Sequence, residues 1–351
     1  MTDVELKKHA QFFKLHYNLM PQPYQSQECN HMMMAYFVVC GLDLLDALTA
    51  AQRSAVVEHV YANHVPAVAA NQFRCGFRGV NFGSPFAPCR DTHAHDYPHL
   101  IMTQCALQLL LTCGDDLSRV DRAGVVASLK RLQMRDGSFC AFEADDGPES
   151  GERDIRFSYC AAVVSFVLDD WSGFDRDAAE AHILRCQAYE GGFGQAPDIE
   201  SHAGSTFCAV AALQLMGRPL SGDNKARCVA WCAQRQGAGF QGRPNKPEDS
   251  CYSFWTGGTL ALLGAYQVVD KQRLCGFVCG CQFDMGGIAK WPQTHPDALH
   301  TFLPLMGTSL TRQVPGLQPV YAALAISERA AKRLNEIHKR TIIETPEIDQ
   351  A

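Results

Sequence analysis

The amino-acid sequence predicts an all-α protein whose helices form a double-layered α/α barrel. The first observation is a triplet with a central hydroxyl residue that recurs along the chain. The hydroxyl residues are spaced by 48, 47 and 48 positions and are Ser158, Thr206, Ser253 and Thr301. So regular a spacing identifies one supersecondary unit that repeats along the chain. The second observation is that an apolar stretch with helical spacing follows each of the first three triplets, as in Phe207 to Leu215.

A glycine turn precedes each triplet, and a glutamine precedes each turn. The glutamines are Gln133, Gln187, Gln236 and Gln282, and the turns that follow them contain Gly137, Gly191-Gly192, Gly239 and Gly286-Gly287. Cys75-Gly76-Phe77 is an earlier and weaker copy of the turn. Glycine at such places marks the chain reversals between periodic segments. Each unit is therefore predicted to be a helix, a glycine turn, a short loop and a second helix.

Helical pairs of this kind either stack as an open solenoid or close into a barrel. The segments that follow the triplets are apolar nearly all round, which suits inner helices buried on both sides. We therefore expect a closed barrel. Because the triplets open these inner helices, their side chains and free N–H groups should meet at one rim, where anionic ligands bind readily.

We expect the 351 residues to form a single domain. The expected boundaries are residues 1–26 for an N-terminal docking segment, 27–328 for the barrel and 329–351 for a C-terminal helix and tail. Val4 to Leu19 is predicted to be an amphipathic docking helix, and the polar end from Ile343 is predicted to fray. A glycine- and proline-bearing connection leads from Asn63 to Pro98, and an inner helix should begin near His99.

Composition excludes several classes of protein. Hydrophobic residues at 47% and charged residues at 19% describe a globular chain with a large core. The net charge of −6 gives no general attraction to nucleic acid or anionic lipid. The N-terminus lacks the apolar core of a signal peptide, and no apolar run long enough for a transmembrane segment follows, so we expect a cytoplasmic protein.

The 16 cysteines are mostly single residues in apolar runs, which indicates buried, reduced thiols. Cys275, Cys279 and Cys281 form the one tight cluster. It is a weak candidate for a metal site, because no fourth ligand stands nearby.

A carboxylate, a thiol and an imidazole stand at related places in two neighbouring repeats. Asp249 and Cys251 immediately precede the third triplet, and His300 opens the fourth. If the repeats superpose, all three lie at adjacent helix starts on the same rim. These ligands suit Zn²⁺, and three protein ligands leave one coordination position open for chemistry. The alternative is an N-capping Asp249, a buried Cys251 and an unrelated His300, which spacing alone favours.

Cations and neutral donors fall near the same rim. They are His202, Arg243, Lys246, Tyr252 and Lys290. Such a set beside a metal can stabilise a departing phosphate or diphosphate. As isolated surface residues they would be unremarkable, but their repeat-matched positions make coincidence a poorer explanation.

The stretch from Asp249 to Trp255, the segment from Arg243 to Lys246 and His300 together resemble the signature of protein prenyltransferase β subunits. The resemblance covers about residues 27 to 328 and implies an α/α barrel with one catalytic zinc. By this match Asp249, Cys251 and His300 are zinc ligands. His202, Arg243, Lys246, Tyr252 and Lys290 become contacts to a prenyl diphosphate, and Tyr252 and Lys290 also join the catalytic residues.

Within that family the chain is most similar to the geranylgeranyltransferase type I branch. Farnesyltransferases carry an aspartate for magnesium where this chain has Lys290, whose charge can replace that of the metal ion. The resemblance therefore implies that Mg²⁺ is not required. Further likeness lies in Gly41-Leu42-Asp43, Arg74 to Gly79, Gly114 to Val120 and Gly242 to Pro247. Asp115-Asp116 resembles a terpene-cyclase acid motif, but it is better explained as a turn and helix cap.

The resemblance also implies residues that line the substrate pockets. The residues expected at the isoprenoid or peptide pocket are Met33, Phe37, Arg156, Trp255 and Leu303, and those expected at the pocket for a CaaX peptide are His99, Phe157 and Leu299. His99 and Arg156 are also expected to orient the peptide carboxylate or to line its pocket, and Leu299 and Phe157 to shape the pocket for X. Met33 stands where farnesyl enzymes have tryptophan and type I enzymes threonine. Methionine is intermediate in size and flexible, so it should admit the longer lipid.

The implied reaction is the transfer of a geranylgeranyl group from geranylgeranyl diphosphate to the cysteine of a C-terminal CaaX motif, with X preferably Leu. The implied partners are a prenyltransferase α subunit, in a heterodimer, and CaaX proteins such as Rho/Rac-type small GTPases. One alternative is a farnesyltransferase β subunit. An alternative of another class is a non-catalytic helical scaffold, against which the complete zinc and cation sets argue.

Overall fold

The computed structural model describes residues 4–69, 72–80, 97–143 and 152–343. Six inner helices lie in these ranges: α2 (His31–Leu44), α4 (Leu100–Cys113), α6 (Ile155–Leu168), α8 (Ala203–Leu215), α10 (Tyr252–Leu262) and α12 (Ala298–Thr311). The outer helices are α1 (Leu6–Asn18), α3 (Ala50–Ala62), α5 (Arg122–Leu132), α7 (Arg176–Arg185), α9 (Gly222–Ala233) and α11 (Lys271–Gly280).

The short elements complete the described part of the chain. They are the 3₁₀ segments η1 (Gln22–Asn30), η4 (Tyr266–Val268) and η5 (Ala322–Leu324), the strands β1 (His64–Val65), β2 (Gly76–Phe77), β3 (Val320–Tyr321) and β4 (Ile326–Ser327), and the last helix α13 (Glu328–Ile337). Both strand pairs, β1 with β2 and β3 with β4, are antiparallel.

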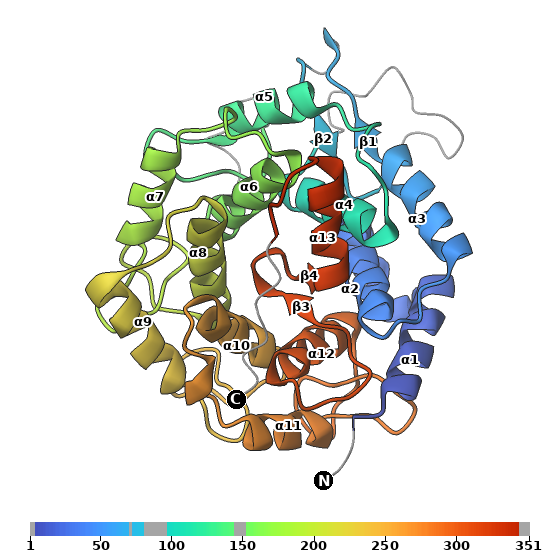
Figure 1. Cartoon of the computed structure of the whole chain (residues 1–351), viewed down its shortest axis with the longest axis vertical. Coiled ribbons are helices and arrows are strands. Elements are labelled where there is room, and N and C mark those ends of the chain that lie inside the picture. The colour runs from blue at the N-terminus through green and yellow to red at the C-terminus, as the bar shows by residue number, and fades with distance from the viewer. Residues whose placement is uncertain (1–3, 70–71, 81–96, 144–151, 344–351) are drawn as a thin grey trace.

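The inner helices form a closed ring (Figure 1). Each packs against the next in the order α2, α4, α6, α8, α10, α12, and α12 returns to α2. The outer helices surround them and cover their outward side, so the barrel has two layers. This confirms the predicted α/α barrel and excludes the open solenoid.

The repeated sequence features have a structural reason. Thr206 Oγ1 accepts a hydrogen bond from the backbone N–H of Phe193 at 2.9 Å, and Thr301 Oγ1 accepts one from Ile288 at the same distance. Thr103 makes the equivalent bond to Phe77 in the weaker copy. A threonine hydroxyl at this position thus ties the glycine turn to the inner helix that follows it. Ser158 makes no such bond, and its hydroxyl has no hydrogen-bond partner among the described residues. Ser253 departs from the pattern and donates instead to the carbonyl of Ser250.

The repeated glutamines join neighbouring units through the outer layer. Gln133 and Gln236 each exchange two hydrogen bonds with the backbone of the N-cap residue of the next outer helix, Asp175 and Asp270 respectively. Gln282 accepts a bond from the backbone N–H of Glu5, which is the N-cap residue of α1. The same joint therefore closes the ring between residues 277 positions apart.

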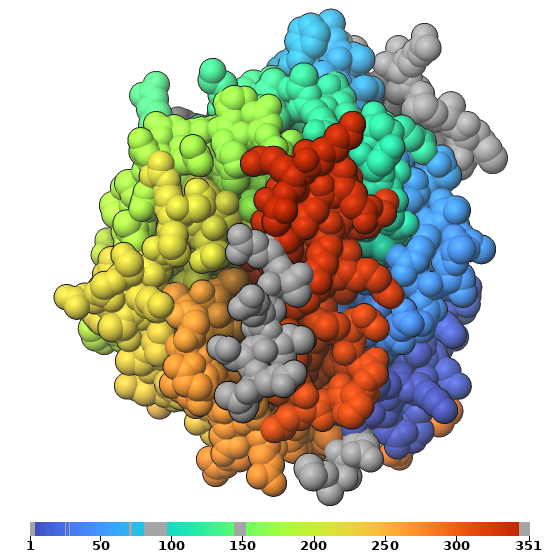
Figure 2. Space-filling view, viewed as in Figure 1, coloured from blue at the N-terminus to red at the C-terminus, as the bar shows by residue number. Residues whose placement is uncertain are grey.

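The two ends of the barrel differ. The segment from β3 to α13 crosses the middle of one end (Figures 1 and 2) and contacts the C-termini of inner helices. His338 Nε2 bonds the carbonyl of Val167 at 2.9 Å, and an Arg333 guanidinium donates to the carbonyl of Gly114 at 2.8 Å. Donors at these places satisfy carbonyls that the helix ends leave unpaired. The N-termini of the inner helices form the opposite rim.

The segment predicted to form a docking helix is α1, which packs against α2 and α12. The predicted fraying falls, from residue 344 on, outside the described residues, as do residues 70–71 and 81–96 of the long connection. None of the helices in the described part of the chain combines the length and apolarity that crossing a bilayer would require.

Candidate metal and diphosphate site

The residues that start the inner helices meet at the rim opposite the C-terminal segment. Four of the N-cap residues there are His99, His202, Cys251 and Asp297, on α4, α8, α10 and α12. The loop after each glycine turn bonds the start of the preceding inner helix: Ala203 N–H donates to the carbonyl of Gly242, and Ser250 N–H to that of Lys290. These joints bring the cations of one repeat beside the helix start of another.

Asp249, Cys251 and His300 come together as the sequence predicted from repeat equivalence. Their carboxylate oxygen, Sγ and imidazole nitrogen all lie within 4.8 Å of one another. Asp249 and Cys251 are buried and His300 is partly buried. The donor set and its spacing fit a zinc ion with one further position open. Among the described residues this is the only such group of three, so the cluster of Cys275, Cys279 and Cys281 is not one.

Protonation at this cluster is set by burial and by its carboxylates. Burial, aided by the neighbouring Asp249 carboxylate, raises the pKa of the Cys251 thiol well above its ordinary value. Burial opposes a charged His300, but hydrogen bonds with Asp249 and Asp297 outweigh it and raise the pKa of His300 to about 9. Burial likewise opposes ionisation of Asp249, yet bonds from His300 and Cys251 lower its pKa. The cluster therefore retains protons that a divalent cation would displace.

Asp297 belongs to the site although the sequence did not single it out. Its Oδ2 lies 2.6 Å from His300 Nδ1, and its Oδ1 accepts the backbone N–H of His300 at 2.8 Å. The imidazole Nε2 is thereby turned toward Asp249, whose Oδ1 lies 3.4 Å away. A helix-capping aspartate three residues before a ligand histidine is the signal that could have found it.

A cavity of about 600 Å³ lies beside this cluster. All five residues of the predicted cation and donor set line it: His202, Arg243, Lys246, Tyr252 and Lys290. The ring of Tyr252 packs against Gly242, where an added Cβ would lie 2.2 Å from the ring. Glycine is therefore required at this point of close approach.

The hydrogen bonds of His202 orient the Tyr252 hydroxyl. His202 Nδ1 accepts the backbone N–H of Gly204 at 3.1 Å, so the proton of the neutral ring lies on Nε2. Nε2 is 3.0 Å from the Tyr252 oxygen and donates to it. Burial lowers the pKa of His202, which favours this neutral form. The Tyr252 O–H is consequently free to donate to an anion.

Acidic side chains balance two of the cations. Arg243 donates to Glu200 at 2.6 Å, and Lys290 Nζ lies 3.7 Å from Asp249. The ammonium group of Lys290 also lies 4.6 Å from the centre of the Trp291 ring. Glu200 lines the same cavity and was missed by the sequence reasoning, since no motif distinguishes it.

The predicted peptide-pocket residues lie on α4, α6 and α12. His99 Nδ1 accepts the backbone N–H of Ile101, and burial lowers the pKa of this ring to about 4. His99 can thus offer a peptide a neutral donor but no charge. Arg156 bonds both oxygens of Asp154 and also Glu152. Phe157 is fully buried, and its ring centre lies 6.1 Å from that of His99 and 5.6 Å from the guanidinium carbon of Arg156, while Leu299 is partly exposed.

The predicted isoprenoid-pocket residues differ in accessibility. Met33 and Trp255 are partly exposed, whereas Phe37 is buried and Leu303 is only 1% exposed. Phe37 packs near Phe302, with ring centres 5.9 Å apart. Met33 and Trp255, together with Arg156, are therefore the members of this set with exposed surface.

The acidic pair Asp115-Asp116 is a turn, as expected. Asp115 Oδ1 accepts the N–H of Leu117, and Asp116 Oδ1 accepts that of Ser118. The expected helix cap is at the C-terminus of α4, where the backbone N–H of Asp115 donates to the carbonyl of Leu110 at 2.9 Å, whereas the N-cap residue of α5 is Asp121. The local hydrogen bonds thus explain why two aspartates stand at these positions.

The chain matches the prenyltransferase alpha-alpha toroid domain over residues 4–342. It is 37% identical to the geranylgeranyl transferase type-1 subunit beta of Arabidopsis thaliana, over 94% of this chain and 91% of that protein. Identity to the subunit of the same name from Dictyostelium discoideum is 36%, over 93% and 96%. The solved structure of Candida albicans protein geranylgeranyltransferase-I complexed with GGPP superposes with a TM-score of 0.84 at 24% identity, over 95% and 99%, which shows a shared fold.

Proposed function

The chain belongs to the prenyltransferase alpha-alpha toroid family and, within it, to the geranylgeranyl transferase type-1 beta subunits, and we propose that it is the catalytic subunit of a zinc-dependent protein geranylgeranyltransferase. The reaction joins the geranylgeranyl group of geranylgeranyl diphosphate to the cysteine of a C-terminal CaaX motif, X preferably Leu. The observation that carries this proposal is the Asp249, Cys251 and His300 cluster beside a cation-lined cavity.

The zinc ion would be held by Asp249, Cys251 and His300. When bound, it would act as a Lewis acid that lowers the pKa of a substrate thiol. Asp297 accepts a hydrogen bond from Nδ1–H of His300, which keeps that proton on Nδ1 and leaves Nε2 facing the site. Burial of Asp249 and Cys251 limits the access of water to these ligands. The thiol of the substrate cysteine then reacts as its thiolate near neutral pH.

The cavity beside the cluster is assigned to the diphosphate. As the sulfur bonds the first carbon of the lipid, the carbon–oxygen bond breaks and its electron pair leaves with the diphosphate. Arg243, Lys246 and Lys290 balance the charge that develops, and the O–H of Tyr252 donates to it. His202 positions Tyr252 by donating to its oxygen. Lys290 also supplies positive charge at the place where a magnesium ion would otherwise be needed.

The α subunit and the CaaX substrates belong to this proposal as well. Relatives named as beta subunits imply an α partner. Small GTPases of the Rho/Rac type are the substrates that we expect from the resemblance to the family. The chain alone should therefore catalyse prenyl transfer poorly, and coexpression with the α partner should restore the activity.

The proposal is tested on the coexpressed complex by measuring bound zinc and turnover together. Cys251→Ala should lose both. Cys113→Ala is the matched control, because Cys113 is also a buried cysteine, at the far end of α4. Full activity in a zinc-free complex, or in Cys251→Ala, would refute the scheme.

A further inference from the structure

One backbone hydrogen bond joins the start of each inner helix to the next unit around the ring. In five of the six inner helices that the structure describes, the acceptor is the carbonyl two residues after the apolar residue that ends the glycine turn. The five bonds are 2.8 to 3.1 Å long and run from Met32 to Gly79, Leu100 to Ala141, Ile155 to Gln195, Ala203 to Gly242 and Ser250 to Lys290.

The sixth joint, at the start of α12, is made by a side chain. The backbone N–H of Ala298, the first residue of α12, donates to the hydroxyl oxygen of Tyr24 at 2.9 Å. Tyr24 lies in η1, 274 positions away in sequence, where the unit that closes the ring leads into α2. The phenol thus provides a partner for an N–H group that has none within its own helix. Among these six joints it is the one that a side-chain substitution can remove, because the other acceptors belong to the backbone.

The first turn of α12 carries His300. Asp297 accepts the backbone N–H of His300 at 2.8 Å, and Tyr24 accepts that of Ala298 at 2.9 Å. This turn is therefore capped from within by Asp297 and from another unit by Tyr24. Because Asp297 also bonds Nδ1 of His300, a shift of the turn would move the imidazole and its supporting carboxylate together away from Asp249.

Tyr24 is itself held by the N-terminal helix α1. Its ring packs edge-on against His16, with centres 5.6 Å apart, and His16 Nδ1 bonds the carbonyl of Phe12 at 2.9 Å. The ring of Phe12 lies against Gly287, where an added Cβ would be 2.8 Å from it, and His9 Nδ1 accepts the N–H of Gly287 at 3.0 Å. The N-terminal segment thus holds both the beginning and the end of the loop that leads into α12.

Building on the proposed function, we propose that Tyr24 is a positioning residue of the zinc site. Its hydroxyl fixes the first turn of α12 and so keeps His300 placed to bind the ion with Asp249 and Cys251. Without this bond the turn has to be ordered when the metal binds, and the cost of that ordering lowers the affinity. The N-terminal segment thereby supports the metal site in addition to docking on the barrel.

The test uses the coexpressed complex and the variant Tyr24→Phe, which keeps the ring against His16 and removes the hydroxyl. Zinc affinity, measured by competition with a chelating dye, should fall about tenfold. The absorption spectrum of Co²⁺ bound in place of zinc should also change, because it depends on how the ligands are arranged around the ion. A loss of overall stability alone would leave that spectrum unchanged. In the metal-free complex, deuterium exchange should accelerate at the first turn of α12.

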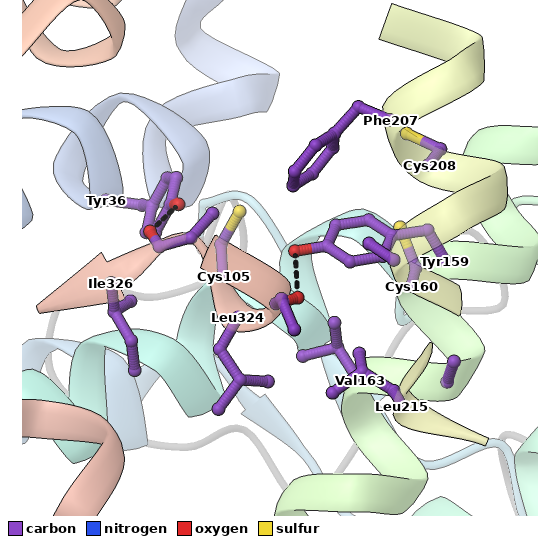
Figure 3. Packing of buried hydrophobic residues seen from close by; sticks show 14 of the residues in the cluster. Tyr36, Cys105, Tyr159, Cys160, Val163, Phe207, Cys208, Leu215, Leu324 and Ile326 are labelled. Carbon is purple, nitrogen blue, oxygen red and sulfur yellow. Dashed lines mark hydrogen bonds between the residues drawn. The ribbon is translucent and has the colours of Figure 1, made fainter. Parts of the chain in front are cut away.

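Tyr159→Phe is the matched control, because it also removes one phenol hydrogen bond. Tyr159 donates to the carbonyl of Ala323 at 3.1 Å in the apolar core (Figure 3), at the end of the barrel opposite the zinc ligands. This variant should keep the zinc affinity, the cobalt spectrum and the exchange at α12 of the wild type. Wild-type values of all three in Tyr24→Phe, or equal losses in the two variants, would overturn the inference alone. A wild-type complex that binds no zinc would overturn the proposed function and the inference with it.

Discussion

Asp297 holds His300 at two points, through the backbone N–H at 2.8 Å and through Nδ1 at 2.6 Å. One carboxylate therefore both caps α12 and fixes the ring that faces Asp249 and Cys251. Carboxylates in this position raise the basicity of a ligand histidine and hold its orientation.

Asp297→Asn should lower zinc affinity by about 10- to 100-fold while α12 stays capped. The asparagine oxygen can still accept the backbone N–H, but its amide cannot accept the Nδ1 proton. Competition with a chelating dye measures the affinity. Asp270→Asn, at the N-cap of α11, is the control and should bind zinc as the wild type does. Equal affinity in the two variants would show that Asp297 only caps its helix.

Zinc binding should release about two protons per ion near pH 7. The pKa of Cys251 is raised and that of His300 is about 9, so near pH 7 Cys251 is a thiol and His300 is an imidazolium. Each has to lose one proton before it can bind zinc. Zinc affinity should accordingly rise with pH, by about 100-fold per unit from pH 7 to 8. Calorimetric titration of the chelator-treated complex in buffers of different ionisation enthalpy counts the protons. Zinc uptake without proton release would contradict the assignment of these ligands.

Glu200→Gln should strengthen the binding of inorganic diphosphate by up to about fivefold, because Arg243 no longer bonds a carboxylate. The gain is small since both side chains are about half exposed, 42% for Arg243 and 52% for Glu200. Glu58→Gln breaks a comparable surface pair with Arg119 away from the cavity and serves as the control. Weaker binding in Glu200→Gln would mean instead that Glu200 positions Arg243 for the diphosphate.

Acid should destabilise the fold partly through His99. Burial lowers the pKa of His99 from 6.5 to about 4, so between these values the unfolded chain binds a proton that the folded chain does not. Its contribution to stability is complete above pH 6.5 and is lost as the pH falls toward 4. His99→Asn keeps a side-chain oxygen that can cap α4. In this variant the free energy of unfolding should fall less between pH 7 and pH 5 than in the wild type, by up to about 2 kcal/mol. Denaturant titrations of both proteins at both pH values measure the free energy of unfolding. If it falls as much in His99→Asn as in the wild type, His99 does not contribute to the acid sensitivity.

The barrel and the grouping of Asp249, Cys251 and His300 could be predicted because both depend on local features repeated in the sequence. Gln133 and Gln236 bond the next unit, and Thr206 and Thr301 bond the turn of their own unit, so periodicity reports these contacts directly. Asp249, Cys251 and His300 occupy related positions in two units, which predicts that they lie on one rim.

What could not be predicted depends on contacts that do not repeat. The ring closes through Gln282 and Glu5, and no periodic signal links these residues. The segment at residues 322–325 is a single irregular stretch whose carbonyls accept hydrogen bonds from side chains of α2, α4 and α6, up to 289 residues away in sequence. The burial of Leu303 likewise follows from packing in the closed ring rather than from its position in a motif.

The most direct test of the account is prenyl transfer by the coexpressed complex to Leu-ending and Met-ending CaaX peptides, with geranylgeranyl or farnesyl diphosphate and with or without magnesium. We expect geranylgeranylation of the Leu-ending peptide at a rate that magnesium does not change. Magnesium-dependent farnesylation of the Met-ending peptide would contradict the type I assignment and the role given to Lys290.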